Sequence, residues 1–158
     1  MELSVLADHP EAVDVVATWY FDEWGHETPG LTLEQVKKQV SASVNRASAP
    51  MLVLATKQGQ AIGAAELKIR EMDIYPDKEF WLGGVYVVKV ERGKGAASAL
   101  VEEVLSRARS AGINHLYLQT EQLADGLYAK LGFKPLEEVC YKGHQVLVMV
   151  ARTGDKGA

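Results

Sequence analysis

The spacing of apolar residues along the chain changes from a helical period to a strand period and back again. Two helical stretches come first, because their apolar residues recur every three or four positions. Asp8 followed by Pro10 and Glu11 is typical of a helix start, so a first helix is predicted from Asp8, with Glu11 completing a capping box. A second helix is predicted from Thr32, with Gln35 at the box position. Its apolar stripe consists of Leu33, Val36, Val40 and Val44.

Short apolar runs replace the helical spacing from Met51 onward. Met51–Ala55 and Ala61–Ile69 flank a turn glycine in Lys57–Gln60 and predict a β-hairpin. Glu79–Val88 predicts a further strand, and the adjacent Gly83–Gly84 within it indicates a bulge or a close backbone approach. After the turn Gly93–Gly95 we expect a long helix ending before Gly112, a strand at His115–Thr120, a short helix at Ala124–Leu131, and a hairpin of Phe133–Tyr141 with Gln145–Arg152. This order, αα-ββ-β-α-β-α-ββ, predicts the α/β class, with a mixed sheet flanked by helices.

Composition and charge narrow the class of protein. The 158 residues, 47% apolar and 24% charged, predict a single domain over residues 1–152 with a polar tail at 153–158. We expect a cytoplasmic protein, because a single cysteine allows no internal disulfide. We expect no membrane partner, because no apolar run is long enough to span a bilayer. The net charge of −4 argues against a nucleic-acid partner. We expect no metal, because Cys140 is the only cysteine and the four histidines lack ligand spacing.

The segment Val85–Ser98 combines a strand, a glycine turn and a helix start. Unpaired N–H groups and the positive end of the helix dipole at such a start bind phosphate or pyrophosphate. Gly93 and Gly95 allow a ligand to approach the main chain, and Arg92 and Lys94 add positive charge. The other interpretation of this pattern is a plain strand-to-helix connection that needs glycine for its turn.

Two motifs carry a resemblance to a known family. The first is Arg92-Gly93-Lys94-Gly95-Ala96-Ala97, preceded by a strand with the aliphatic pair Val85 and Val87. The second is Tyr128 on a predicted short helix, followed by Leu131-Gly132-Phe133. Both resemble motifs of the Gcn5-related N-acetyltransferase (GNAT) superfamily, in which the first holds the pyrophosphate of coenzyme A. The predicted element order is similar to that superfamily over nearly the whole chain.

The resemblance implies an N-acetyltransferase that uses acetyl-coenzyme A (acetyl-CoA) as co-substrate and needs no metal. In the superfamily the strand before the loop pairs with the pantetheine arm, which here implicates Val85, Tyr86 and Val87. The backbone N–H of Val87 is implied to polarise the thioester carbonyl, and Tyr128 to protonate the departing thiolate. The implied pyrophosphate contacts are Arg92, Gly93, Lys94, Gly95, Ala96, Ala97 and Ser98.

The chain departs from the superfamily pattern at two positions. Glu121 stands where many members carry an asparagine, so a cofactor contact from this position is in doubt. Lys89 stands where a proline usually precedes the motif. Neither change removes a backbone donor, so the expectation of cofactor binding is unaffected.

The sequence leaves the general base and the acceptor open. Glu66, Glu79 and Glu121 are candidate bases, as is a water chain, and each carboxylate is equally interpretable as a solvated charge. We expect the acceptor pocket over the two N-terminal helices, near Trp24. Acidic residues on that side favour a cationic primary amine, either a small molecule or a peptide; they are Asp22, Glu23, Glu27, Glu71, Asp73, Asp77 and Glu79. A homodimer is compatible with the resemblance.

Two other functions compete with this interpretation. Gly93-x-Gly95-x-x-Ser98 after a strand echoes a dinucleotide-binding fingerprint, with Glu121 after the next strand. That unit occurs once, in mid-chain and after a hairpin, and the remaining residues cannot build a second mononucleotide half. The alternative from another class is a regulatory domain that binds acyl-CoA without turnover, against which the intact motif and Tyr128 both count.

Overall fold

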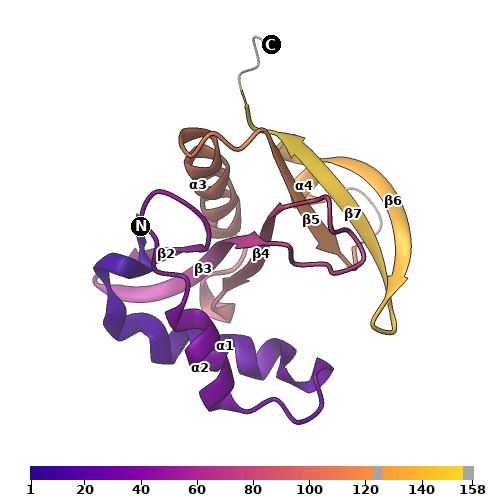
Figure 1. Cartoon of the computed structure of the whole chain (residues 1–158). Coiled ribbons are helices and arrows are strands. Elements are labelled where there is room, and N and C mark those ends of the chain that lie inside the picture. Colours follow the sequence, from indigo (N-terminus) through magenta and orange to yellow (C-terminus); the bar gives the residue numbers. More distant parts are fainter. Residues whose placement is uncertain (123–125, 155–158) are drawn as a thin grey trace.

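The structure is a computed structural model that describes residues 1–122 and 126–154. Its centre is a seven-stranded mixed sheet in the order β1-β2-β3-β4-β5-β7-β6 (Figure 1). The strands are β1 (Glu2–Val5), β2 (Met51–Lys57), β3 (Gln60–Ile69), β4 (Phe80–Val87), β5 (His115–Thr120), β6 (Lys134–Tyr141) and β7 (His144–Arg152). The helices are α1 (Val13–Trp24), α2 (Leu33–Ser41), α3 (Ala96–Ser110) and α4 (Leu127–Lys130). The predicted α/β class is confirmed, and β1 precedes the elements that were predicted.

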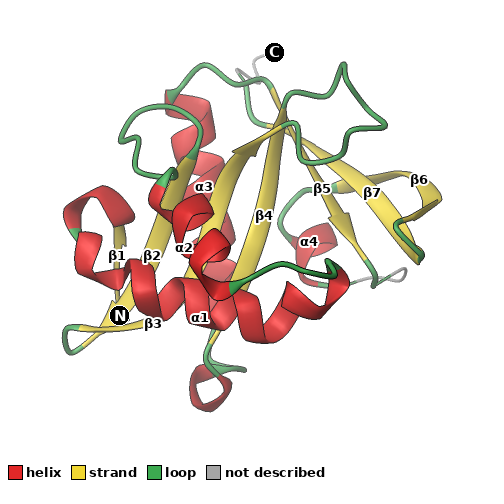
Figure 2. Ribbon diagram, turned by 60° about the horizontal axis from the view of Figure 1, so that its bottom comes forward, coloured by secondary structure: helices red, strands yellow, loops and turns green. Residues whose placement is uncertain are grey.

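Helices cover both faces of the β1–β4 half of the sheet. In Figures 1 and 2, α1 and α2 lie together on one face and α3 lies on the opposite face. The alternation of side chains along β2 explains this arrangement. Leu52 and Leu54 belong to the core cluster of α1 and α2, whereas Val53 belongs to the larger cluster that contains Leu100 and Val104 of α3. Strands buried on both faces account for the continuous apolar run at Met51–Ala55.

The first α-helix begins later than predicted. Leu6–Asp8 and Pro10–Ala12 are 3₁₀ turns, and α1 begins at Val13 without a side-chain cap. Asp8 does not cap the helix because its carboxylate pairs with the guanidinium group of Arg46, far along the sequence. The predicted capping box at Asp8 is therefore wrong, although the helix that follows it is present.

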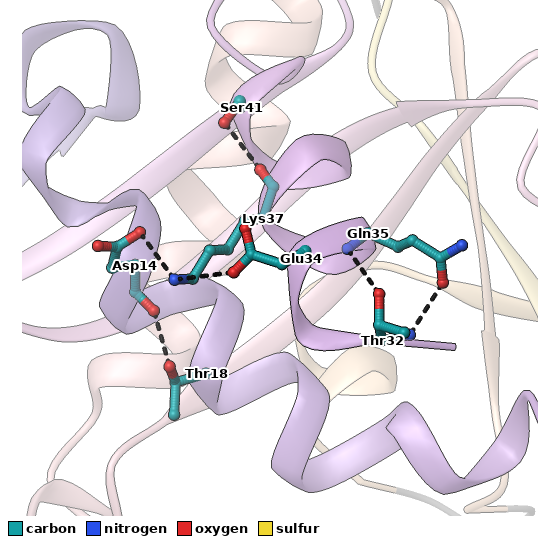
Figure 3. A network of polar contacts seen from close by, with 7 residues as sticks. All are labelled: Asp14, Thr18, Thr32, Glu34, Gln35, Lys37 and Ser41. Atoms are coloured by element: carbon teal, nitrogen blue, oxygen red, sulfur yellow. Dashed lines mark hydrogen bonds and ion pairs between the residues drawn. The ribbon is translucent and has the colours of Figure 1, made fainter. Parts of the chain in front are cut away.

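The predicted capping box of α2 is confirmed (Figure 3). The Gln35 N–H donates to Thr32 Oγ1 at 3.2 Å, and the Thr32 N–H donates to Gln35 Oε1 at 2.9 Å. In the same figure Lys37 Nζ lies 3.6 Å from Asp14 of α1 and 3.5 Å from Glu34, and so links the two helices. Val44 does not continue the apolar stripe, because the helix has ended before it and its side chain is exposed.

The two halves of the sheet meet at a single parallel pair. Trp81 of β4 pairs with Tyr117 of β5, and no further register pair between these strands is found in the described part of the chain. The two strands diverge beyond it in Figure 2. On its other side β4 pairs with β3 throughout, with an irregularity between Ala64 and Glu66 opposite Gly83. The predicted bulge at the adjacent glycines is thus confirmed, and the sheet opens beyond Trp81.

The C-terminal part forms the β6–β7 hairpin, in which β7 pairs with β5 and β6 is the curved edge strand of the sheet (Figure 1). The short helix α4 begins at Leu127; the predicted start at Ala124 lies outside the described residues. Thr153, predicted to open the polar tail, is fully buried, and its N–H donates to the carbonyl of Asn114 at 2.9 Å. No helix in the described ranges is long and apolar enough to cross a membrane.

Candidate active site

The loop before α3 leaves an open cradle of main-chain donors. Gly93 and Gly95 have φ values of 80° and 91°, a left-handed conformation that glycine adopts without strain. No atom lies within 4 Å of a Cβ built on either residue, so space remains above the loop. Gly95 is the N-cap of α3 and supplies no side-chain oxygen to the first-turn N–H groups of Ala96, Ala97 and Ser98. This geometry suits an anion with several oxygens.

Two cationic side chains flank the cradle. Arg92 is anchored to the strand, because its Nε donates to the Val87 carbonyl at 2.8 Å and its guanidinium lies 5.5 Å from the centre of the Tyr86 ring. The Tyr86 ring in turn stacks on Trp19 of α1 at 5.2 Å between centroids. Lys94 is more exposed: its Nζ lies 3.8 Å from Glu91 Oε1, and 59% of its side chain is exposed. The loop therefore carries positive charge at the place where the donors converge.

The edge of β4 that faces the sheet opening presents a free backbone N–H. The Val88 N–H donates to the Ile62 carbonyl at 2.9 Å, so it points toward β3. Because successive residues of a strand point their N–H groups to opposite edges, the Val87 N–H projects toward the opening beside β5. The Val87 carbonyl, which receives Arg92 Nε, projects to this edge as well. By the same alternation the main-chain groups of Tyr86 face β3, and Val85 lies in the irregular stretch that precedes it.

A cavity of about 840 Å³ lies along this opening. Its walls come from the segment between α1 and α2, from the ends of β3, β4 and β5, and from the β6–β7 hairpin. Among its lining residues are Gly84 and Val85 of β4 and Tyr128 of α4. Four carboxylates also line it, which are those of Glu27, Glu66, Glu71 and Glu121.

Tyr128 is held in this cavity by its own short helix. The N–H of Phe133 donates to the Tyr128 carbonyl at 3.0 Å, and the two rings meet edge to face at 6.0 Å between centroids. Burial raises the pKa of the Tyr128 phenol, and the negative charge of Glu71 raises it further. The phenol therefore stays protonated at neutral pH and is available as a proton donor.

Glu66 belongs to a buried polar network behind the bulge. Its Oε1 accepts a hydrogen bond from Ser43 Oγ at 2.7 Å, and only 6% of the residue is exposed. The Tyr20 hydroxyl donates to the Gly84 carbonyl at 2.7 Å, and burial, followed by the negative charge of Glu66, raises the pKa of Tyr20 well above its usual value. A Cβ at Gly84 would lie 2.6 Å from that hydroxyl, so the network requires glycine here.

Glu71 reaches the cavity from the loop between β3 and β4. Its Oε2 accepts a hydrogen bond from Gln119 Nε2 of β5 at 2.8 Å, and its Oε1 lies 3.5 Å from Lys68 Nζ. Sequence analysis did not predict this position and counted Glu71 only among the acidic residues near the acceptor. The signal that could have found it is Gly83, because a Cβ there would lie 2.3 Å from Glu71 Oε1.

The remaining predicted acidic residues divide between the cavity and the outside. Glu121 lines the cavity, where its Oε1 lies 3.6 Å from His144 Nδ1. Glu27, Glu121 and His144 offer ligand atoms within 4.8 Å of one another, a spacing that a cation could bridge. Glu79 is exposed and pairs with Arg70 at 3.7 Å, away from the cavity. Asp22, Glu23, Asp73 and Asp77 are also absent from the cavity lining.

Comparison with known protein families identifies the family of this chain. The profile of the acetyltransferase (GNAT) family matches residues 10–133, which include the cradle, the open strand edge and Tyr128. The chain belongs to the GNAT family. This GNAT protein is therefore an acetyltransferase, of a family that uses acetyl-CoA. No curated protein matches the chain by sequence.

Solved structures share the fold over almost the whole length of this GNAT chain. The aminoglycoside 6'-acetyltransferase type Ii has a TM-score of 0.75 at 19% identity, with 97% of each chain covered. An aminoglycoside 6'-N-acetyltransferase complexed with coenzyme A has a TM-score of 0.74 at 17% identity, again with 97% of each chain covered. The ribosomal-protein-alanine N-acetyltransferase from Brucella melitensis has a TM-score of 0.75 at 17% identity, covering 96% of this chain and 99% of that one. At these identities the likeness concerns the fold.

Proposed function

We propose that this GNAT protein transfers the acetyl group of acetyl-CoA to a primary amine by direct attack of the amine on the thioester. The observation that carries the proposal is the open edge of β4 beyond Trp81, with a helix start that lacks a side-chain cap at its end. An extended pantetheine arm fits such an edge as an added strand, because it can hydrogen bond to the outward groups of Val87. The pyrophosphate then falls on the donors of residues 93–98.

The thioester carbonyl is placed against the Val87 N–H in this arrangement. Attack by the amine puts negative charge on the carbonyl oxygen, and a fixed backbone donor stabilises that charge without reorganising. The C–S bond then breaks, and the thiolate needs a proton. Tyr128 supplies it, because the phenol lines the cavity along the opening beside β4 and its raised pKa keeps it protonated until the thiolate forms.

The acceptor is a cationic primary amine, either a small molecule or a peptide. Four carboxylates line the cavity, and the basic side chains that also line it are those of Lys68, Lys142 and His144. Lys68 lies 3.5 Å from Glu71, and Glu66 is enclosed, so the carboxylates of Glu27 and Glu121 are left to attract cations at the mouth. A cavity that concentrates cations raises their association rate and loses this effect as salt is added. The neighbours named for aminoglycosides and for a ribosomal-protein alanine have amine acceptors of both kinds.

Release of free coenzyme A tests the proposal. Purified protein is mixed with acetyl-CoA and a panel of small amines and peptides, and thiol release and acetylated product are followed together. We expect turnover with at least one cationic amine and none with neutral alcohols. Cofactor-dependent stabilisation without turnover on any amine would refute catalysis and favour the acyl-CoA-binding regulatory domain, whereas neither binding nor turnover would refute both.

A further inference from the structure

Two contacts fix the side chain of Arg92 beside the cradle and leave its charge unpaired. Its Nε donates to the Val87 carbonyl at 2.8 Å, and its guanidinium carbon lies 5.5 Å from the centre of the Tyr86 ring. It forms no ion pair within the described part of the chain, whereas Lys94 of the same loop lies 3.8 Å from Glu91. Because a carbonyl and a ring hold a guanidinium without neutralising it, Arg92 keeps its full charge for an incoming anion.

The ring on which Arg92 rests is itself fixed by helix α1. Trp19 stacks on Tyr86 with 5.2 Å between the ring centroids and 20° between the planes, and Trp24 meets Tyr86 edge-on at 6.4 Å. All three rings pack against the core cluster of α1 and α2. A stacked ring in a packed cluster has little rotamer freedom. The support of the guanidinium therefore reaches from the cofactor loop back to the first helix.

The outer donors of Arg92 remain available to a ligand. Among the residues that the structure describes, only Nε of this side chain has a hydrogen-bond partner, so the N–H groups of both terminal nitrogens are unused. A guanidinium presents such donors to phosphate oxygens in a fixed planar geometry. Arg92 directly precedes Gly93, so these donors belong to the same loop as the main-chain cradle. The two sets of donors suit one anion with several oxygens.

We propose that Tyr86, supported by Trp19, is a positioning residue that holds the Arg92 guanidinium ready for the pyrophosphate of acetyl-CoA, a role that rests on the cofactor binding of the proposed function. An arginine side chain that is disordered before binding loses rotamer freedom when it contacts a phosphate, and this loss weakens binding. Tyr86 imposes the order before the cofactor arrives, so the loss on binding is smaller. The effect acts through Arg92 and concerns the phosphates of the cofactor, not its acyl group.

Variants of Tyr86 test this role. Tyr86→Leu removes the ring and keeps an apolar side chain, whereas Tyr86→Phe keeps the ring. Titration calorimetry measures the Kd of acetyl-CoA and of S-acetylpantetheine, a donor that lacks the pyrophosphate. We expect Tyr86→Leu to raise the Kd of acetyl-CoA roughly 3- to 10-fold, the scale of ordering one long side chain, and to leave that of S-acetylpantetheine unchanged. Tyr86→Phe should bind both as the wild type does.

Matched variants separate positioning from packing. Phe21→Leu also removes a ring packed against the α1–α2 cluster, but not the ring on which Arg92 rests, so the Kd of acetyl-CoA should stay unchanged. Trp19→Leu withdraws the support of Tyr86 and should weaken acetyl-CoA binding alone, by less than Tyr86→Leu does. In an Arg92→Ala background, Tyr86→Leu should raise the Kd no further, because the ring then has no guanidinium to hold.

The outcomes decide between a positioning role and a structural one. An equal loss with S-acetylpantetheine would overturn the proposal, as would an undiminished loss in the Arg92→Ala background, because both would indicate that Tyr86 only shapes the strand. If Tyr86→Leu lacks a cooperative thermal unfolding transition, Trp19→Leu with and without Arg92→Ala decides by the same two criteria. Calorimetry needs no acceptor, so wild-type protein that binds acetyl-CoA but acetylates no amine would refute the proposed acetyl transfer and not this role.

Discussion

The cradle before α3 can be tested with two glycine variants in which the substitution imposes the same backbone strain. Gly95 and Gly112 lie before and after α3, with φ values of 91° and 80°, and a Cβ at either would meet no atom within 4 Å. Substitution by glutamate therefore introduces the same left-handed strain and the same charge at both positions. Only Gly95→Glu places that charge where the pyrophosphate is proposed to bind.

The expected magnitudes follow from this geometry. Left-handed strain of about 1–2 kcal/mol, at about 2–4 °C per kcal/mol for a protein of this size, lowers the Tm of either free variant by roughly 2–8 °C. The helix dipole moderates the loss for Gly95→Glu at the N-terminus and increases it for Gly112→Glu at the C-terminus, by about 0.3–1 kcal/mol each. Acetyl-CoA at about 100 times its Kd stabilises the folded protein by about 2.7 kcal/mol, or roughly 5–11 °C.

Thermal unfolding with and without acetyl-CoA measures both effects. We expect the cofactor to raise the Tm of the wild type and of Gly112→Glu by the full amount, and that of Gly95→Glu by almost nothing. NAD should raise none of them. A full cofactor shift in Gly95→Glu would refute the location of the pyrophosphate, and loss of the shift in both variants would show that the effect comes from destabilised α3 alone.

Three further predictions concern the residues around the cavity. Tyr128→Phe should bind acetyl-CoA normally in a thermal-shift assay but lose roughly 10- to 1,000-fold in kcat, and an acyl donor whose leaving group needs no proton should reduce the loss. Tyr20→Phe should lower the free energy of unfolding by about 1–3 kcal/mol, because it leaves the part-buried Gly84 carbonyl without its donor. The Tyr117 hydroxyl has no hydrogen bond in the described part of the chain, so Tyr117→Phe should cost much less in the same denaturant titration. Because the pKa of Tyr20 is raised in the folded state, its contribution is fully present below the unfolded value near 10 and is lost as pH rises through the folded pKa. Finally, kcat/KM for a cationic acceptor should fall as salt is raised from low to high ionic strength, whereas salt-independent rates would refute the electrostatic attraction of the cavity mouth.

Local patterns in the sequence predicted the elements whose determinants are local. The capping box of Thr32 and Gln35 is confirmed because both residues lie within one turn of the helix they begin. The strand His115–Thr120 has the predicted bounds, and Gly112 follows α3 in the left-handed conformation expected of a helix stop. The family assignment succeeded for the same reason, since each of its motifs occupies one strand–loop–helix unit or one short helix.

Tertiary contacts decided the features that the sequence did not predict. Asp8 could cap a helix, but Arg46 takes its carboxylate from across the fold. The strand β1 has only four residues, and its pairing with β2, from Glu2 with Thr56 to Val5 with Val53, gives it its extended form. The position of Glu71 over Gly83 was not predicted, because the path of its loop depends on how β3 and β4 pair. The cofactor contacts predicted for Val87 and the loop residues, and the proton transfer predicted for Tyr128, remain predictions that the variants above address.

The single pair that joins the two halves of the sheet has a consequence for the lifetime of the protein. Within residues 1–122 and 126–154, Trp81 and Tyr117 form the one register pair between β4 and β5, so a pantetheine arm in the opening would add backbone pairing beside it. Local opening at this seam, which exposes the chain to proteases, would then become rarer as acetyl-CoA rises. Cellular acetyl-CoA would set how long each molecule survives as well as how fast it works, so abundance and activity would follow the same metabolite.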